Sequence, residues 1–252
     1  MQGSRNPADI LGYIMMNIVA DLHTHTIASG HAYGTIREMA LSAHERGLSM
    51  LGITEHAPGI PGTVNPFYYL NLAAIPRELY GVRMLFGSEV NVLDDGSLSL
   101  EQKYMDKLDY AIAGIHLQCY TDKGTEGNTD CLISCMKDKK VFFVSHPDDD
   151  HTPLNYERLV MAAKKYHVAL EVNNSSLMKP EHRLNCRENY ARMLELCGRH
   201  KVPVIVSSDA HDPSSVGRFD LAIDLIERSG FDLSLVLNTD ADKVESFIKA
   251  DD

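Results

Sequence analysis

Residues 17–23 read Asn-Ile-Val-Ala-Asp-Leu-His, and residues 50–55 read Met-Leu-Gly-Ile-Thr-Glu. Both are short runs rich in apolar and β-branched residues, which is the composition of a buried strand. Between them, Ile36–Arg46 carries apolar residues at helical spacing, which predicts an amphipathic helix. A strand, a helix and a second strand in this order form a βα unit, from which parallel sheets covered by helices are built.

The same alternation continues along the chain. Further strands are predicted at Met84–Val90, Tyr110–His116, Val141–His146, Val168–Asn173 and Pro203–Asp209, and further helices at Thr129–Asp138, Asn155–Tyr166, Arg187–His200 and Gly217–Arg228. Ser234–Thr239 has the composition of one more short strand, followed by a closing helix at Asp240–Lys249. Seven or eight βα repeats in 252 residues without a linker predict an α/β barrel in a single domain. Residues 1–16 are expected to be an N-terminal extension or residues left from cloning, so that the domain spans residues 17–252.

The composition restricts the partners of the protein. The formal net charge of −11 disfavours a nucleic-acid surface, because phosphate backbones are bound by clustered lysines and arginines. No run of 18 apolar residues occurs, and the first residues do not resemble a signal peptide. We therefore expect a cytoplasmic protein that does not bind membranes. The five cysteines lack the paired C-x-x-C spacing of a zinc or redox site, which indicates reduced structural thiols.

The twelve histidines are unevenly distributed along the chain. The first predicted strand ends in Asp21-Leu22-His23-Thr24-His25, and alternate strand residues point to the same face, so two imidazoles lie together. Metal-binding side chains also occur in the next loop and at five further strand ends: His31, His56, Glu89, His116, His146, Asp209 and His211. In a parallel barrel the C-terminal strand ends meet at the face where active sites lie. These residues therefore predict a metal site.

The other five histidines lie elsewhere. His44, His167 and His200 fall within or at the end of predicted helices, and His182 lies in a polar loop, so we interpret these four as structural. His151 follows three aspartates just beyond His146. A solvated loop position is the simpler interpretation of His151, and a contact with substrate is the alternative.

The strand-end motifs resemble those of the PHP (polymerase and histidinol phosphatase) superfamily, and most closely its YcdX-type phosphatases. The matching segments are Asp21-Leu22-His23-Thr24-His25, His31, Thr54-Glu55-His56, Gly87-Ser88-Glu89, Gly114-Ile115-His116, Ser145-His146-Pro147 and Ser207-Ser208-Asp209-Ala210-His211. The resemblance implies a distorted (β/α)7 barrel with a trinuclear centre. It implies one metal held by His23, His25, Glu89 and Asp209, a second held by Glu89, His116 and His146, and a third held by His31, His56 and His211.

Phosphate-ester hydrolysis is the chemistry that such a centre favours. A metal-bound water has its pKa lowered from about 15.7 to about 7, so a hydroxide bridging the first two metals is expected to attack phosphorus. We expect Zn²⁺, with Mn²⁺ or Fe²⁺ as alternatives, because imidazole and carboxylate ligands accept all three. Glu89, Asp209 and His211 are the candidate catalytic residues. Arg218 is a candidate phosphate-binding residue, because a guanidinium binds two oxygens at once; a solvated arginine is the alternative.

Several questions stay open at the level of sequence. A small phosphorylated substrate is expected, but the loops at residues 57–66 and 121–128 carry no recognisable specificity code. The alternatives are a histidinol-phosphate phosphatase, a nuclease-like module and a non-catalytic metal-binding regulator. Glu55 is expected to orient a ligand histidine. Glu171, Asn173 and Asn174 end the sixth strand without an evident metal ligand. A plain turn is the simplest interpretation of that segment; the alternative is that Glu171 and Asn173, on one face, or Asn174, on the other, line the pocket as hydrogen-bonding groups.

Overall fold

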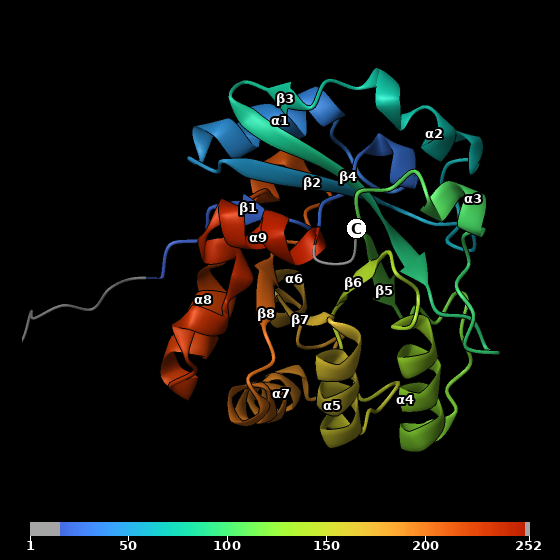
Figure 1. The fold of residues 1–252 in the computed structure, drawn as a ribbon, viewed down its shortest axis with the longest axis vertical. Coiled ribbons are helices and arrows are strands. Elements are labelled where there is room, and N and C mark those ends of the chain that lie inside the picture. Colours follow the sequence, from blue (N-terminus) through green and yellow to red (C-terminus); the bar gives the residue numbers. More distant parts are fainter. Residues whose placement is uncertain (1–15, 250–252) are drawn as a thin grey trace, which may run out of the picture.

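Seven parallel strands form a nearly closed barrel in the computed structural model, which describes residues 16–249 (Figure 1). Their order around the barrel is β1 (Ala20–Asp21), β2 (Met50–His56), β4 (Val82–Asn91), β5 (Ala111–Gly114), β6 (Val141–Val144), β7 (Ala169–Asn173) and β8 (Val204–Ser207). A short β3 (Glu78–Leu79) pairs antiparallel with β4. The predicted distorted (β/α)7 barrel in a single domain is therefore confirmed. Residues 1–15 of the expected N-terminal extension lie outside the described residues, whereas Met16 is buried in the core.

Asn238 closes the barrel between its first and last strands. Its side-chain amide donates hydrogen bonds to the Ala20 carbonyl (2.7 Å) and the Val206 carbonyl (2.6 Å), and its Oδ1 accepts one from the Val206 amide (3.1 Å). Beyond these contacts, Thr24 and Ala210 form a single parallel bridge. A buried side chain thus replaces part of the backbone ladder that a fully closed barrel would have.

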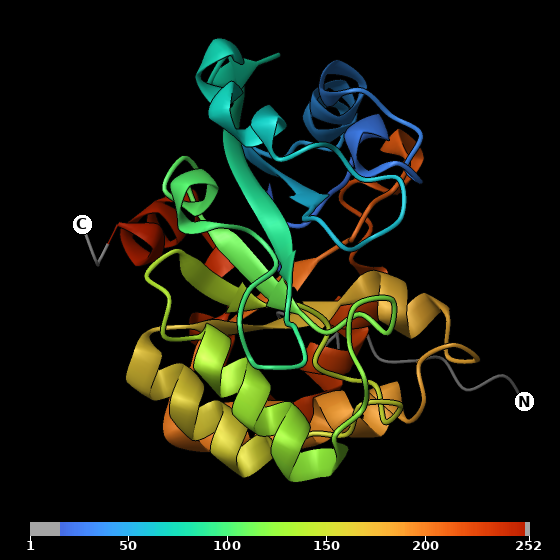
Figure 2. The ribbon, with the colours of Figure 1, turned by 90° about the vertical axis from the view of Figure 1, so that its right-hand side faces the viewer.

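Helices cover the outside of the barrel in two groups (Figures 1 and 2). On one side, α4 (Gly124–Cys135), α5 (Tyr156–Tyr166) and α7 (Cys186–His200) lie next to one another, and α8 (Asp220–Ser229) contacts α7. On the other side, α1 (Ile36–Glu45) packs on β2 and β4. The short helices α2 (Phe67–Leu70) and α3 (Gln102–Met105) lie in connections between strands, and α6 (Asn174–Met178) lies between β7 and α7. Thr35 and Glu38 form a capping box that fixes the start of α1.

The barrel interior is filled by apolar side chains, with Tyr110 at its centre. The Tyr110 hydroxyl donates to the Leu22 carbonyl at 2.6 Å, and a Cβ atom at Gly52 would lie 1.9 Å from this hydroxyl oxygen. Only glycine can therefore stand opposite Tyr110. Helix α9 (Ala241–Ile248) covers the N-terminal end of the barrel, where Phe247 stacks on Phe143. The predicted closing helix is confirmed.

Two expectations about local structure were wrong. Ser234–Thr239 forms parts of two 3-10 turns, Leu233–Leu235 and Leu237–Thr239, with only one parallel bridge to β8 at Val236. The side chain of Asn238 takes the place that a strand would occupy. The expected loop at residues 121–128 already contains the start of α4, because the buried Asn128 side chain accepts from the Lys123 amide and donates to Asp122.

Strand register brings the predicted site residues to one end of the barrel. Residue His56 of β2 pairs with Glu89 of β4, and Asn91 of β4 pairs with Gly114 of β5. Side chains of paired residues in neighbouring strands point to the same face. None of the helices within residues 16–249 is both long and apolar enough to span a bilayer.

Candidate metal centre

Three buried side chains and the partly exposed Asp209 face one another around the Nε2 atoms of His23 and His25. These two nitrogens lie 3.1 Å apart. Glu89 Oε2 lies 3.3 Å from His23 Nε2 and 3.5 Å from His25 Nε2, and Asp209 Oδ1 lies 3.6 Å and 3.4 Å from the same two atoms. The structure therefore brings together the four residues expected to hold the first metal.

Buried acceptors orient both imidazoles. His23 Nδ1 lies 2.7 Å from Glu171 Oε1, so a proton on Nδ1 leaves the Nε2 lone pair free to face the group. His25 Nδ1 lies 3.1 Å from Ser29 Oγ, and the Ser29 hydroxyl donates to Glu55 Oε2 at 2.5 Å. Glu55 was expected to orient a ligand histidine, and it contacts His25 through Ser29.

A second group lies around the other oxygen of Glu89. Glu89 Oε1 is 3.2 Å from His116 Nε2 and 2.9 Å from His146 Nε2. His116 is oriented by Asn91, whose Oδ1 lies 2.8 Å from His116 Nδ1. The backbone of His146 has φ 30°, an uncommon value outside glycine, and its amide donates to Glu171 Oε2 at 2.6 Å. Glu89 thus contacts the first group with one oxygen and the second group with the other.

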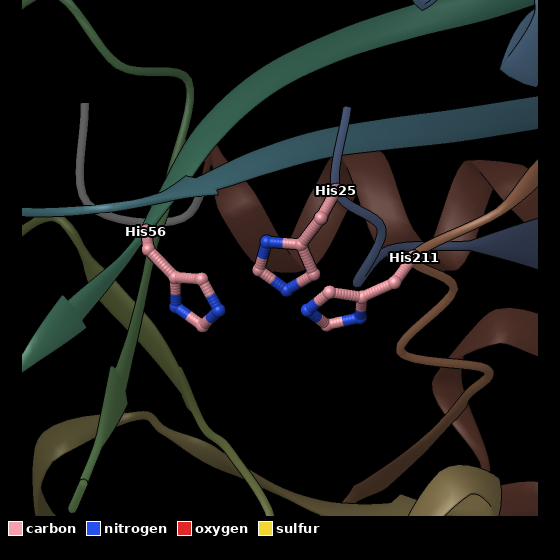
Figure 3. Close-up of side chains that lie close together, drawn as sticks. All are labelled: His25, His56 and His211. Carbon is pink, nitrogen blue, oxygen red and sulfur yellow. The ribbon is translucent and has the colours of Figure 1, made fainter. Parts of the chain in front are cut away.

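The third expected group lies at the more exposed side of the centre. His31 Nε2 and His211 Nε2 are 3.2 Å apart, and the rings of His31 and His56 stack with centroids 4.9 Å apart. Nitrogens of His25, His56 and His211 lie within 4.8 Å of one another, and their rings face a common space (Figure 3). His56 Nδ1 is also 2.9 Å from Glu89 Oε2, because the two residues are register partners. His56 therefore lies between the groups.

Three observations test whether these residues fit divalent ions. Zinc–nitrogen bonds of 2.0–2.1 Å separate tetrahedral ligands by about 3.4 Å, close to the distances in the first group. Within residues 16–249, the buried His56 Nδ1 and Glu89 Oε2 lie 2.9 Å apart but form no hydrogen bond with each other or with another group. A Cβ at Gly114 would lie 2.3 Å from Ser145 Oγ and 3.1 Å from Glu89 Oε1, so glycine keeps this space open. The donor set and its geometry fit metal ions.

The charges of the carboxylates and histidines in the centre also favour metal ions. Burial alone would raise the pKa of the Glu89 carboxyl, but His116, His23 and His56 outweigh burial and hold that pKa well below its usual range. Burial would lower the pKa of His23, but Glu171, Glu89 and Asp209 raise it well above the usual value. In the described part of the chain, no lysine or arginine pairs with these three carboxylates. A metal ion would supply the positive charge and displace the His23 proton.

Arg183, and not the expected Arg218, contacts the centre. Within the described residues, the Arg218 guanidinium makes no hydrogen bond or ion pair, and its amide donates to the Ser215 carbonyl. Arg183 contacts the site instead, since its Nη2 donates to the His146 carbonyl at 2.8 Å and to Asp148 Oδ1 at 2.5 Å. The phosphate-binding role of Arg218 stays a prediction.

Glu171 is the main residue that sequence reasoning undervalued. Its carboxylate contacts His23, the His146 amide and the Ser207 hydroxyl, so the plain-turn interpretation of this strand end is wrong. Asn173 donates to both Glu171 and Asp209. The available signal was a carboxylate two residues before a strand end, on the face that should line the barrel.

Comparisons with known proteins agree with this geometry. Residues 21–227 match the family described as "PHP domain". A protein of Thermoanaerobacter sp. (strain X514) named "Probable phosphatase" is 39% identical over 236 residues, covering 93% of this chain and 96% of the relative. A protein of Clostridium novyi (strain NT) with the same description is 38% identical with the same coverage.

Two solved structures share the fold. The hisK structure from Listeria monocytogenes has a TM-score of 0.60 at 18% identity, and the match covers 81% of this chain and 99% of that chain. The histidinol phosphate phosphatase from Lactococcus lactis, solved with zinc, L-histidinol and phosphate, has a TM-score of 0.56 at 18% identity, with coverage of 84% and 94%. At this identity the likeness concerns the fold.

Proposed function

This chain belongs to the PHP domain family, and we propose that it is a metal-dependent phosphatase that hydrolyses small phosphomonoesters at a trinuclear centre. The observation that carries the proposal is the position of the Glu89 carboxylate, whose two oxygens contact two separate groups of histidines. A carboxylate in this arrangement is suited to bridging two ions. The phosphatase names of relatives that match nearly the whole chain support the reaction class.

Nine residues would hold the ions. One ion would be held by His23, His25, Glu89 and Asp209, a second by Glu89, His116 and His146, and a third by His31, His56 and His211. Zinc suits these imidazole and carboxylate ligands best, and manganese or iron would also be accepted. When bound, the ions would lower the pKa of a water nucleophile and attract the negatively charged phosphate.

The chain's own residues would orient the reacting groups. Glu171 and Glu55 hold the Nδ1 protons of His23 and His25, directly or through Ser29, so that both Nε2 atoms stay unprotonated. Burial would raise the pKa of Asp209, but His23, His25 and His211 hold it well below the usual range. Asp209 therefore stays ionised and is suited to hold a metal ion, and His211 lies beside it at the exposed side.

Metal content and hydrolysis of p-nitrophenyl phosphate test the proposal together. Purified protein is expected to bind two or three ions per chain and to lose activity with a chelator. The variants His25→Ala and Glu89→Gln should lose at least about 100-fold in kcat/KM. The control variant His44→Ala, at an exposed position of α1, should match wild type. Full activity in both site variants would overturn the role of the centre in hydrolysis. Metal binding below two ions per chain would overturn a multinuclear centre, and two ions per chain would overturn the third ion.

No specific contact favours the alternative functions. The likeness to the histidinol phosphate phosphatase concerns the fold at 18% identity, and the fold alone does not transfer a substrate. A nuclease-like module would need a cationic surface, which the net charge of −11 disfavours. Binding of metal without turnover in the assay above would indicate the non-catalytic regulator.

A further inference from the structure

A cavity of about 260 Å³ adjoins the centre on the side of His116 and His146. Its walls come from the segments after β5 and β6 and from the loop that carries His182 and Arg183. The other seven proposed ligands, among them His31 and His211, do not line it. A phosphomonoester held at Glu89 would therefore find space for its leaving group in this cavity.

Much of the cavity wall is apolar. Ile115, Leu117, Leu132, Pro147 and Leu154 line it. Leu117 is 58% exposed, so its side chain is accessible to a ligand in the cavity. The volume lies just below the 300–1,000 Å³ typical of sites for drug-sized ligands. The cavity therefore suits a compact leaving group that is at least partly apolar.

Among residues 16–249, Arg183 is the only lysine or arginine that lines the cavity, and two of its three nitrogens donate hydrogen bonds within the protein. Its Nε lies 3.3 Å from Asp148 Oδ2, its Nη2 binds Asp148 Oδ1 and the His146 carbonyl, and its Nη1 lies 3.7 Å from Asp149 Oδ2. Asp148 and Asp149 both line the cavity. Two carboxylates thus face one guanidinium, so this group of side chains carries a net negative charge.

We propose that this cavity receives the leaving group of the substrate and selects a neutral aryl or short alkyl group over one that carries a second anionic group. This inference rests on the proposed phosphatase function and adds the class of substrate. A carboxylate or second phosphate on the leaving group would lie near Asp148 and Asp149 without a cationic partner, and like charges in such a contact oppose binding. Monophosphates of neutral alcohols or phenols would avoid this repulsion.

Phenyl phosphate and 4-carboxyphenyl phosphate test the charge selectivity in the metal-loaded enzyme. The carboxyl group makes the phenol a better leaving group, so chemistry alone would favour 4-carboxyphenyl phosphate. The cavity is expected to reverse this order, with kcat/KM at least about tenfold higher for phenyl phosphate, mainly through KM. Equal or higher kcat/KM for 4-carboxyphenyl phosphate would overturn the inference.

A lysine placed in the cavity should change the preference. Leu117→Lys is expected to shift the ratio of the two kcat/KM values about tenfold toward 4-carboxyphenyl phosphate, and Thr152→Lys provides a second position on the same wall. Leu41→Lys on α1 adds the same charge to a 40% exposed leucine away from the cavity and should leave the ratio unchanged. An unchanged ratio in the folded cavity variants would overturn the inference. Absence of hydrolysis of both substrates in wild type would instead overturn the phosphatase function.

Discussion

Replacing Glu171 with glutamine is expected to weaken metal binding while leaving the barrel folded. The carboxylate accepts from His23 Nδ1 with one oxygen (2.7 Å) and from the His146 amide with the other (2.6 Å). A glutamine of the same shape has only one oxygen, so its NH₂ group must face one of these two donors. Either His23 or the His146 backbone loses its orientation, and these residues belong to different metal groups.

The size of the effect follows from the burial of Glu171, which is completely inaccessible. A buried donor left without its acceptor costs about 1–3 kcal/mol, which lowers the melting temperature by about 2–12 °C for a chain of this length. Loss of the acceptor behind a ligand histidine typically reduces metal affinity or activity about 10–100-fold. The affinity loss should therefore be the larger signal.

Titration of the apoprotein with zinc, followed by p-nitrophenyl phosphate turnover at saturating metal, measures both effects. The matched control is Glu157→Gln, which makes the same change at a half-exposed carboxylate that binds His200 at 3.0 Å. That variant should behave as wild type. Metal affinity and turnover of Glu171→Gln within twofold of wild type would refute the role assigned to this carboxylate.

Three further predictions concern the centre, the barrel seam and the ions. Gly114→Ala should reduce activity at least about tenfold, because its Cβ would lie 2.3 Å from Ser145 Oγ, whereas Gly198→Ala in α7, with no contact under 3.6 Å, should retain activity and stability. Asn238→Ala removes three buried hydrogen bonds and should lower the unfolding free energy in urea by about 3 kcal/mol; an unchanged midpoint would contradict its role at the seam. Chelation should lower the melting temperature, and zinc at about 100 times its Kd should restore about 2.7 kcal/mol per site; a chelator without effect would contradict metal binding in the fold.

The strands and the proposed ligands were predictable because they depend on local patterns. A strand-end His-x-His places both rings on one face whatever surrounds it, and parallel strands bring their ends together. His23 and His25 therefore followed from residues 21–25 alone. The pairing of His56 with Glu89 depends on the register of β2 and β4 and required the structure.

The errors concern contacts between distant residues. Glu171 contacts His23 across 148 positions, and nothing near Glu171 in the sequence indicates that partner. Asn238 replaces a strand because its side chain bonds to Ala20, 218 positions away. The start of α4 depends on the buried side chain of Asn128, whose amide also donates to the Pro153 carbonyl, 25 positions away. Local patterns therefore indicate elements and ligands, but not the residues that orient them.

The centre and the closure of the barrel depend on the same short segment. Asp21 in β1 accepts hydrogen bonds from the Ser208 amide (3.2 Å), the Ser208 hydroxyl (2.5 Å) and the Gly217 amide (2.9 Å). Ser208 precedes Asp209, whose φ of 51° requires external support. The first strand thus supplies His23 and His25 and also fixes the segment that carries Asp209. A weakened seam should consequently impair the first metal group, so Asn238→Ala is expected to lose stability and metal affinity together, whereas Glu171→Gln should lose mainly affinity.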